Sequence, residues 1–182
     1  YDLSSKPGGR CLSYNDSEFG RALDNGTHLV MGANNNLLEL MKVVGAMGNL
    51  APLRPTLYPF VDISSGMGWI LRPNRGPLPW WLLSNSRRVP GTTLADYLQI
   101  KKLMNANEDQ TVAEILSNTG ILYERLWTPL CQAALNTNPS RASAKLLWNV
   151  IQKTFLKGAS ACTPYLARKS LRGTFVDPTV AF

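Results

Sequence analysis

The sequence predicts an α/β chain, with α+β character within its 182 residues. We expect a partial Rossmann-like domain over residues 1–50. A substrate domain over residues 51–182 should then consist of a β-hairpin followed by a helical layer. Three observations predict this layout: a glycine-rich turn near the first residue, two short apolar runs around a Gly-containing loop, and a long region with helix-capping patterns.

The glycine-rich turn is Lys6–Arg10 (KPGGR), and an acid, Asp2, precedes it. In dinucleotide-binding folds a G-x-G-x-x-G turn comes first, and an acid about 20 residues later binds the ribose hydroxyls. Asp2 would be that acid. Gly8 and Gly9 would let the backbone pass close to a cofactor, and Arg10 would donate to a phosphate. No G-x-G-x-x-G occurs in the chain, so we expect that strand-turn-helix upstream of Tyr1. The pattern indicates the second half of an FAD site.

A second segment, Asp24–His28 (DNGTH), follows soon after and makes this interpretation more specific. A Gly-Gly turn alone is common at protein surfaces, and a lone histidine is usually structural. His28 is the sole histidine of the chain, and its place beside Gly26 favours a position near the cofactor. The candidate cofactor-binding residues are therefore Asp2, Gly8, Gly9, Arg10, Gly26, Thr27 and His28.

Short elements are expected over residues 29–71. The apolar run Leu29–Met31 predicts a strand that ends at Gly32, and Asn34–Lys42 predicts a helix capped by Asn34 or Asn35 and ended by Gly45 or Gly48. The prolines at positions 52, 55 and 59 predict a linker. Phe60–Ile63 and Trp69–Leu71 then predict a hairpin around a Gly-containing loop.

The rest of the chain is predicted to be irregular from Pro73 to Gly91 and helical beyond. Thr93–Asp96 and Thr111–Glu114 have the capping-box pattern. A helix over 122–135 contains Pro129, so we expect a kink or break near Thr128. Asn138-Pro139 predicts another helix start, and Gly158 its end.

Charge is unevenly distributed. The net charge is +7, and the stretch from Arg125 to Val176, named the basic stretch below, contains eight basic residues and no acid. It predicts either a surface for anionic lipid or phosphate, or a solvated face. No nucleic-acid-binding motif occurs. The basic residues are Arg125, Arg141, Lys145, Lys153, Lys157, Arg168, Lys169 and Arg172.

The chain offers few groups for catalysis. Its three cysteines, Cys11, Cys131 and Cys162, have neither disulfide-framework nor metal-ligand spacing, which favours reduced thiols in a cytoplasmic protein and no metal site. The acids form no obvious pair, so no catalytic residue is nominated, as expected where a flavin performs the chemistry. Trp80-Trp81 predicts either contact with an apolar substrate or membrane, or a buried patch.

Several longer sequence segments are distinctive when taken together: Leu71–Asn74, Leu78–Leu83, Arg88–Thr92, Tyr123–Leu130 with Ala133–Thr137, Ala161–Pro164 and Phe175–Pro178. They resemble the squalene-associated, FAD-dependent desaturases, the hydroxysqualene dehydroxylase family within the amine-oxidase and phytoene-desaturase superfamily. The resemblance runs along the whole chain.

The resemblance implies a flavin-binding domain interleaved with a substrate domain. It also implies an FAD-dependent oxidoreductase that reduces hydroxysqualene to squalene on the route to hopanoids. The partner that the resemblance implies is an apolar isoprenoid substrate. The basic stretch adds the expectation of peripheral contact with anionic lipid at the inner face of the membrane. Two alternatives remain: another amine-oxidase-like or carotenoid-desaturase-like flavoenzyme, or an inactive fragment that acts as a basic membrane-surface module.

Overall fold

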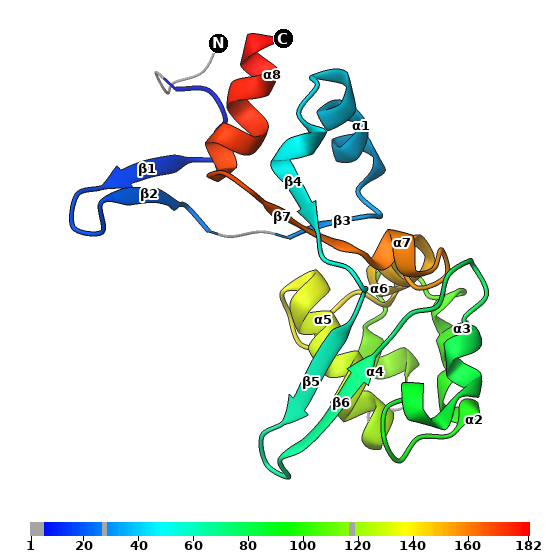
Figure 1. The fold of residues 1–182 in the computed structure, drawn as a ribbon. Helices are drawn as coiled ribbons and strands as arrows, with labels where there is room; N and C mark the ends of the chain where they lie inside the picture. Colours follow the sequence, from blue (N-terminus) through cyan, green and yellow to red (C-terminus); the bar gives the residue numbers. More distant parts are fainter. Residues whose placement is uncertain (1–5, 27–28, 117–118) are drawn as a thin grey trace. The chain divides into compact units, whose positions relative to one another are not determined.

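The computed structural model describes residues 6–26, 29–116 and 119–182. The chain forms two compact units, which are described separately (Figure 1). Unit 1 consists of Tyr1–Pro55 and Thr163–Phe182, and unit 2 of Thr56–Cys162. The mixture of helices and strands confirms the predicted mixed class. The sequence predicts one domain boundary, after residue 50, whereas the structure divides the chain after Pro55 and again after Cys162.

Unit 1 contains two small sheets. β1 (Ser13–Asp16) and β2 (Arg21–Asp24) form an antiparallel hairpin. The second sheet has the order β3-β7-β4, with both outer strands antiparallel to the central one. Its strands are β3 (Val30–Met31), β4 (Leu50–Pro52) and β7 (Pro164–Ala167). The predicted strand at Leu29–Met31 is thus confirmed as β3.

The helices of unit 1 are α1 (Asn35–Val43), η1 (Met47–Asn49), η5 (Arg172–Val176) and α8 (Asp177–Ala181). α1 confirms the predicted helix, and Gly45 follows it with a positive φ of 67°. Met41, Ala46 and Leu50 are buried together, and Tyr165 and Phe175 pack against them. Residues from both ends of the chain therefore share one small core.

The β1–β2 hairpin also holds the start of η5. Ser13 Oγ donates to Asp24 Oδ1 at 2.6 Å and accepts from the backbone N–H of Arg172 at 2.9 Å. Asp24 Oδ1 accepts from the N–H of Leu171 at 2.9 Å. Since the first N–H groups of a helix have no partner within it, these two side chains cap η5.

Unit 2 begins with the predicted hairpin. β5 (Tyr58–Asp62) pairs antiparallel with β6 (Met67–Leu71), and Phe60 stacks on Trp69 with the ring centroids 5.5 Å apart. The predicted proline linker is wrong at Pro52, the last residue of β4, and at Pro59, which lies inside β5 opposite Ile70. A proline is tolerated there because each strand of a two-stranded sheet has an open edge, where an N–H bond is not needed.

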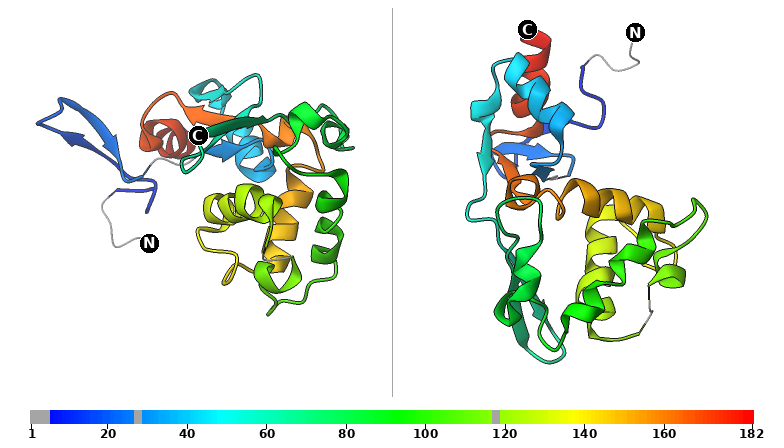
Figure 2. Two further views of the ribbon diagram at one scale, coloured as in Figure 1. Left: turned by 90° about the horizontal axis from the view of Figure 1, so that it is seen from below. Right: turned by 90° about the vertical axis from the view of Figure 1, so that its right-hand side faces the viewer.

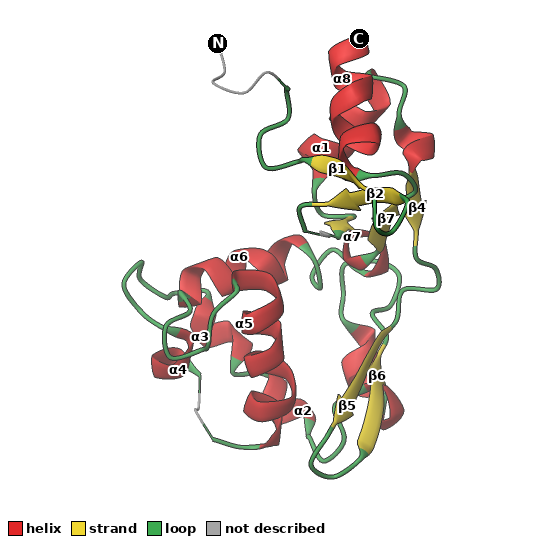
Figure 3. Ribbon diagram, turned by 90° about the vertical axis from the view of Figure 1, so that its left-hand side faces the viewer, coloured by secondary structure: helices red, strands yellow, loops and turns green. Residues whose placement is uncertain are grey.

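The helices of unit 2 follow the hairpin along the chain and surround the hydrophobic core of the unit. α6 packs against α3, α4 and α5 (Figures 2 and 3). Fully buried Leu103, Val112, Leu147 and Ile151 lie in this core. The helices are η2 (Trp80–Leu83), η3 (Asn85–Arg87), α2 (Leu94–Tyr97), α3 (Ile100–Leu103), α4 (Val112–Ile115), η4 (Tyr123–Trp127), α5 (Thr128–Leu135), α6 (Ala144–Lys153) and α7 (Ala159–Cys162).

Several predicted helix boundaries in unit 2 are confirmed, but the predicted end at Gly158 is wrong, because α6 ends at Lys153. Both capping boxes form, at Thr93 with Asp96 and at Thr111 with Glu114. The helix start at Asn138-Pro139 is wrong: α6 begins at Ala144, where Ser143 Oγ accepts from the N–H of Leu146 at 3.3 Å. Asn138 instead accepts the N–H groups of Arg141 and Ala142 in a turn. Within the described ranges, no helix is long and apolar enough to cross a membrane.

The predicted break near Thr128 is also confirmed. η4 is a five-residue π-helix, and the N–H of Thr128 donates to the carbonyl of Tyr123, five residues back. In a regular α-helix the ring of Pro129 would collide with the carbonyl of Arg125. The wider π turn avoids this collision, and α5 then starts with proline in its first turn.

Candidate functional site

The predicted cofactor half-site lies in unit 1, at a turn over Gly8–Cys11. The N–H of Cys11 donates to the carbonyl of Gly8 at 2.9 Å. Gly8 has a φ of 111°, and a Cβ there would come within 2.7 Å of Val176 Cγ2. Gly8 is therefore required by packing against the C-terminal helical segment, whether or not a cofactor is bound.

Gly9 and Arg10 have a different environment. Gly9 has a φ of 54°, and a Cβ there would meet no atom within 4 Å. Arg10 is exposed, and no residue of the described ranges forms a hydrogen bond or ion pair with its side chain. An open backbone and an unengaged guanidinium fit contact with an anionic group such as a pyrophosphate.

The other predicted cofactor residues are only partly described. Gly26 is exposed, with a φ of 106° that favours glycine. Asp2, Thr27 and His28 lie outside the described residues. Asp24, which supported the sequence interpretation, caps η5 instead. The described residues of the predicted half-site are thus Gly8, Gly9, Arg10 and Gly26, and their contact with a flavin dinucleotide stays a prediction.

Unit 2 contains a cavity that the sequence did not predict. Its volume is about 300 Å³, and its walls come from Gly91, the α2–α3 region and the segment from Thr119 to Trp127. This is the lower end of the volumes typical of small-molecule sites, about 300–1,000 Å³. Asp96 lines it, but its Oδ2 already accepts from the backbone and side chain of Thr93. The remaining walls include Ile121, Leu122, Tyr123 and Trp127.

The π-helix η4 positions the aromatic wall of this cavity. Tyr123 and Trp127 are four residues apart and both line it, whereas Arg125, midway between them, points to the hairpin. Residues two apart on a helix do not share a face. The proline-induced turn therefore separates an aromatic face from a charged one within five residues.

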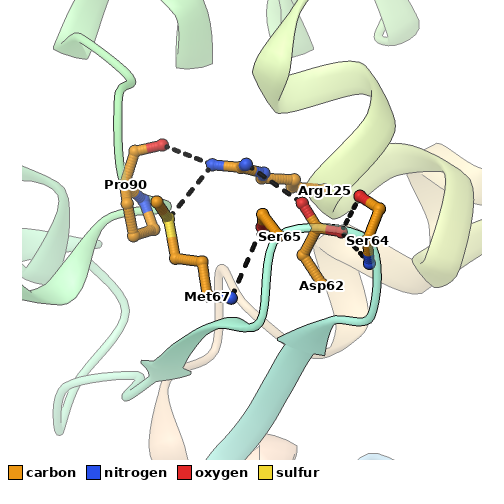
Figure 4. Close-up of polar contacts among 6 residues, drawn as sticks. All are labelled: Asp62, Ser64, Ser65, Met67, Pro90 and Arg125. Carbon is orange, nitrogen blue, oxygen red and sulfur yellow. Dashed lines mark hydrogen bonds and ion pairs between the residues drawn. The ribbon is translucent and has the colours of Figure 1, made fainter.

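Arg125 ties η4 to the β5–β6 hairpin (Figure 4). Its Nη2 lies 3.1 Å from Asp62 Oδ2, and its Nη1 donates to the carbonyl of Pro90 at 3.4 Å. Its guanidinium also lies over the Trp69 ring, 5.6 Å from the centroid. Hydrogen bonds from Ser64 and Ser65, together with Arg125, hold the pKa of Asp62 well below its usual range. Arg125 thus has a structural role here.

The structure places the aromatic residues whose roles the sequence left open in different environments. Tyr123 and Trp127 line the cavity, and Trp69 stacks in the hairpin. The Trp80-Trp81 pair divides: Trp81 is 5% exposed and Trp80 is 61% exposed. The interpretation as a buried patch is therefore confirmed for Trp81, while contact of Trp80 with an apolar substrate or membrane stays a prediction.

The cysteines fit the prediction of free thiols. All three are unpaired, and Cys131 and Cys162 are completely buried. Burial raises the pKa of Cys131 to about 11 and that of Cys162 to about 12. Neither would be a thiolate at neutral pH. Among residues 6–26, 29–116 and 119–182, no group of acids, histidines and cysteines could hold a metal ion.

A sequence profile described as flavin containing amine oxidoreductase matches residues 1–174. The chain belongs to this family. Membership confirms the predicted superfamily, a family described as containing flavin. The mixed helices and strands of the structure agree with this family. The Rossmann-like fold of residues 1–50 stays a prediction.

Three curated relatives of this chain are named hydroxysqualene dehydroxylase. The protein from Sinorhizobium fredii is 37% identical over 180 residues, or 99% of this chain. Those from Rhodopseudomonas palustris and Zymomonas mobilis are 35% and 31% identical over 100% of it. The chain spans 43–44% of the length of these relatives, so it corresponds to less than half of each of them.

Proposed function

We propose that the protein to which this chain belongs, called the parent below, is an FAD-dependent hydroxysqualene dehydroxylase that forms squalene. The observation that carries this proposal is the 31–37% identity to three relatives of that name along essentially the whole chain. The family match supports a flavin-dependent enzyme, and the resemblance of the sequence segments supports hydroxysqualene as its substrate.

In this proposal, residues of unit 1 hold the adenine dinucleotide. Asp2 would accept hydrogen bonds from the ribose hydroxyls. Gly8 and Gly9 would lie along the pyrophosphate, and Arg10 would form an ion pair with the pyrophosphate. Gly26, Thr27 and His28 would approach the flavin ring. Bound reduced flavin supplies a hydride.

The substrate part of the proposal uses the cavity of unit 2. An allylic or cyclopropyl-adjacent C–O bond ionises more easily where aromatic faces stabilise delocalised positive charge and water is excluded. Tyr123 and Trp127 are the aromatic candidates because both line the cavity. At about 300 Å³, the cavity would hold one segment of a long isoprenoid, and because it is partly open, the rest of the parent would have to complete the exclusion of water.

The decisive experiment is turnover by the parent. With reduced FAD it should convert hydroxysqualene to squalene, identified by mass spectrometry, and leave polar amines unchanged. Conversion of an amine, or of a carotenoid precursor instead, would favour the first alternative, another flavoenzyme of this family. A purified parent without bound flavin or activity would favour the second, an inactive protein that binds membranes.

The cofactor residues can be tested separately through flavin retention. Gly9→Trp would block the open backbone, and Arg10→Ala would remove a charge-assisted contact worth about 1.5–3 kcal/mol. Both should lower the flavin-to-protein ratio of the purified parent. Arg54→Ala, which removes another exposed arginine of unit 1, is the matched control. Unchanged flavin content in both variants would contradict the assignment of Gly9 and Arg10.

We also propose a cytoplasmic protein that meets the inner face of the membrane, since its substrate partitions into lipid. The basic stretch supports this only in part, because Arg125, Lys145 and Arg172 are paired with Asp62, Glu108 and Asp177. The exposed candidates Lys153 and Lys157 belong to unit 2, and Arg168 and Lys169 to unit 1. Vesicle flotation of the parent with these four changed to Gln tests their contribution.

A further inference from the structure

The strongest unassigned surface is the segment 72–88 of unit 2, named the Trp80 loop below. It contains η2 and η3 and presents three large apolar side chains to solvent. Leu78 is 57% exposed, and Trp80 and Leu83 are each 61% exposed. A single exposed apolar residue is ordinary, but three within six residues, one of them tryptophan, indicate a contact surface.

The loop is held in shape by its own hydrogen bonds. The Asn74 side chain donates to the carbonyls of Arg75 and Leu78 at 2.8 and 2.7 Å, and accepts from the N–H of Trp81 at 3.2 Å. Arg88 donates to the carbonyl of Leu82 at 3.2 Å. These contacts fix which tryptophan of the pair points inward.

Two further contacts anchor the loop to the body of unit 2. Trp81 packs edge-on against Tyr97, with ring centroids 5.8 Å apart. The backbone of Gly158 approaches Gly76 so closely that a Cβ on Gly158 would come within 2.9 Å of three Gly76 backbone atoms. Because Trp81 is anchored in the core, Trp80 is exposed by the fold itself.

The charges of the segment complement an anionic surface. No acid occurs between Asp62 and Asp96, while Arg72, Arg75, Arg87 and Arg88 all lie between them. Arg72 and Arg75 are exposed, and no acid in the described parts of the chain pairs with either. Tryptophan and leucine flanked by arginines are the composition that binds at the boundary of headgroups and acyl chains.

We propose that the Trp80 loop docks the parent onto an anionic lipid bilayer, with Leu78, Trp80 and Leu83 entering the interface and Arg72 and Arg75 contacting lipid phosphates. This deepens the proposed function, since a squalene precursor must be taken from lipid. A rigid loop suits this role because little conformational entropy is lost on binding.

The test uses FAD-loaded parent and vesicles of phosphatidylcholine with or without phosphatidylglycerol. Trp80→Ser should weaken partition into the anionic vesicles about tenfold or more, through lost apolar burial. Arg75→Gln should weaken it about fivefold, and this loss should vanish at high salt. Brominated lipid should quench wild-type emission more than that of Trp80→Ser.

The matched control is Ile63→Ser, which removes the most exposed large apolar side chain of unit 2, at 95%, next to an acid rather than arginines. It should leave partition unchanged. An equal loss in Ile63→Ser and Trp80→Ser would overturn the proposal. So would protection of Trp80 from acrylamide quenching in vesicle-free parent, because the rest of the parent would then cover the loop.

Turnover in detergent micelles separates this inference from the proposed function. Trp80→Ser should retain wild-type conversion when micelles deliver the hydroxysqualene. Loss of conversion there would place Trp80 in the substrate site and overturn the docking proposal. Lipid binding without any conversion by wild type would instead contradict the proposed function alone.

Discussion

Two segments of the chain, one in each unit, have the same local structure. In unit 2, η4 ends at Trp127 and is followed by Thr128-Pro129; in unit 1, η5 ends at Val176 and is followed by Asp177-Pro178. In both, the last N–H before the proline donates five residues back. A proline one turn into a helix thus produces the same π turn twice.

Their surroundings differ. Arg125 of η4 pairs with Asp62 of the hairpin, and Tyr123 and Trp127 line a cavity. Arg172 of η5 pairs with Asp177, only five residues away, and the start of η5 is capped by the β1–β2 hairpin. The local sequence therefore determines the π turn, while the neighbouring elements determine whether it shapes a cavity or closes a small core.

The largest expected difference between the two segments is in the size of the buried side chain at the end of each π turn, since Trp127 and Val176 are only 5% and 8% exposed. Trp127→Ala should destabilise the parent by about 3–5 kcal/mol, whereas Val176→Ala should cost about 1.5–3 kcal/mol. Urea denaturation followed by circular dichroism measures both. Trp127→Phe, which retains much of the volume, should lose less. Equal costs for the two alanine variants would show that the segments are energetically alike.

A smaller effect is expected at the start of η5, which depends on Ser13. Ser13→Ala removes the acceptor for the Arg172 N–H and should cost about 0.5–2 kcal/mol, the usual range for a lost helix cap. Ser86→Ala is the control, because Ser86 is exposed and its hydroxyl contacts only Ser84 among the described residues. A cost no greater than that of the control would mean that η5 does not need its cap.

The smallest expected effect is the pH dependence of the link between η4 and the hairpin. The pKa of Asp62 is lowered from its ordinary value of 3.8, so its contribution is complete above that value and is lost as pH falls toward the lower, folded-state pKa. The difference in melting temperature between wild type and Asp62→Asn should shrink from pH 5 to pH 2. A difference that does not change with pH would contradict the lowered pKa.

Local signals in the sequence predicted much of the fold. The β5–β6 hairpin, both capping boxes and the break at Pro129 depend on a few neighbouring residues, and all three are confirmed. β7 was not predicted because its partners, β3 and β4, are more than 100 residues away in the chain. The predicted start of α6 was wrong because Asn138-Pro139 is as typical of a turn as of the start of a helix.

The candidate sites were harder to predict for the same reason. The Gly8–Arg10 turn was visible in the sequence, but the packing of Val176 on Gly8 joins residues far apart in the chain. Likewise, the sequence alone does not show which of Trp80 and Trp81 is buried. Asn74 and Tyr97 decide which of them is buried, and no local pattern identifies either as the partner.

The pairing of β4 with β7 makes unit 2 an insertion in unit 1. The chain leaves unit 1 just after β4 and returns at Thr163, next to β7, where the N–H of Leu53 donates to the carbonyl of Pro164 at 2.8 Å. The two crossover points are thus held together by one antiparallel ladder. The two ends of the inserted segment consequently lie as close together as the neighbouring ends of two strands in an ordinary hairpin.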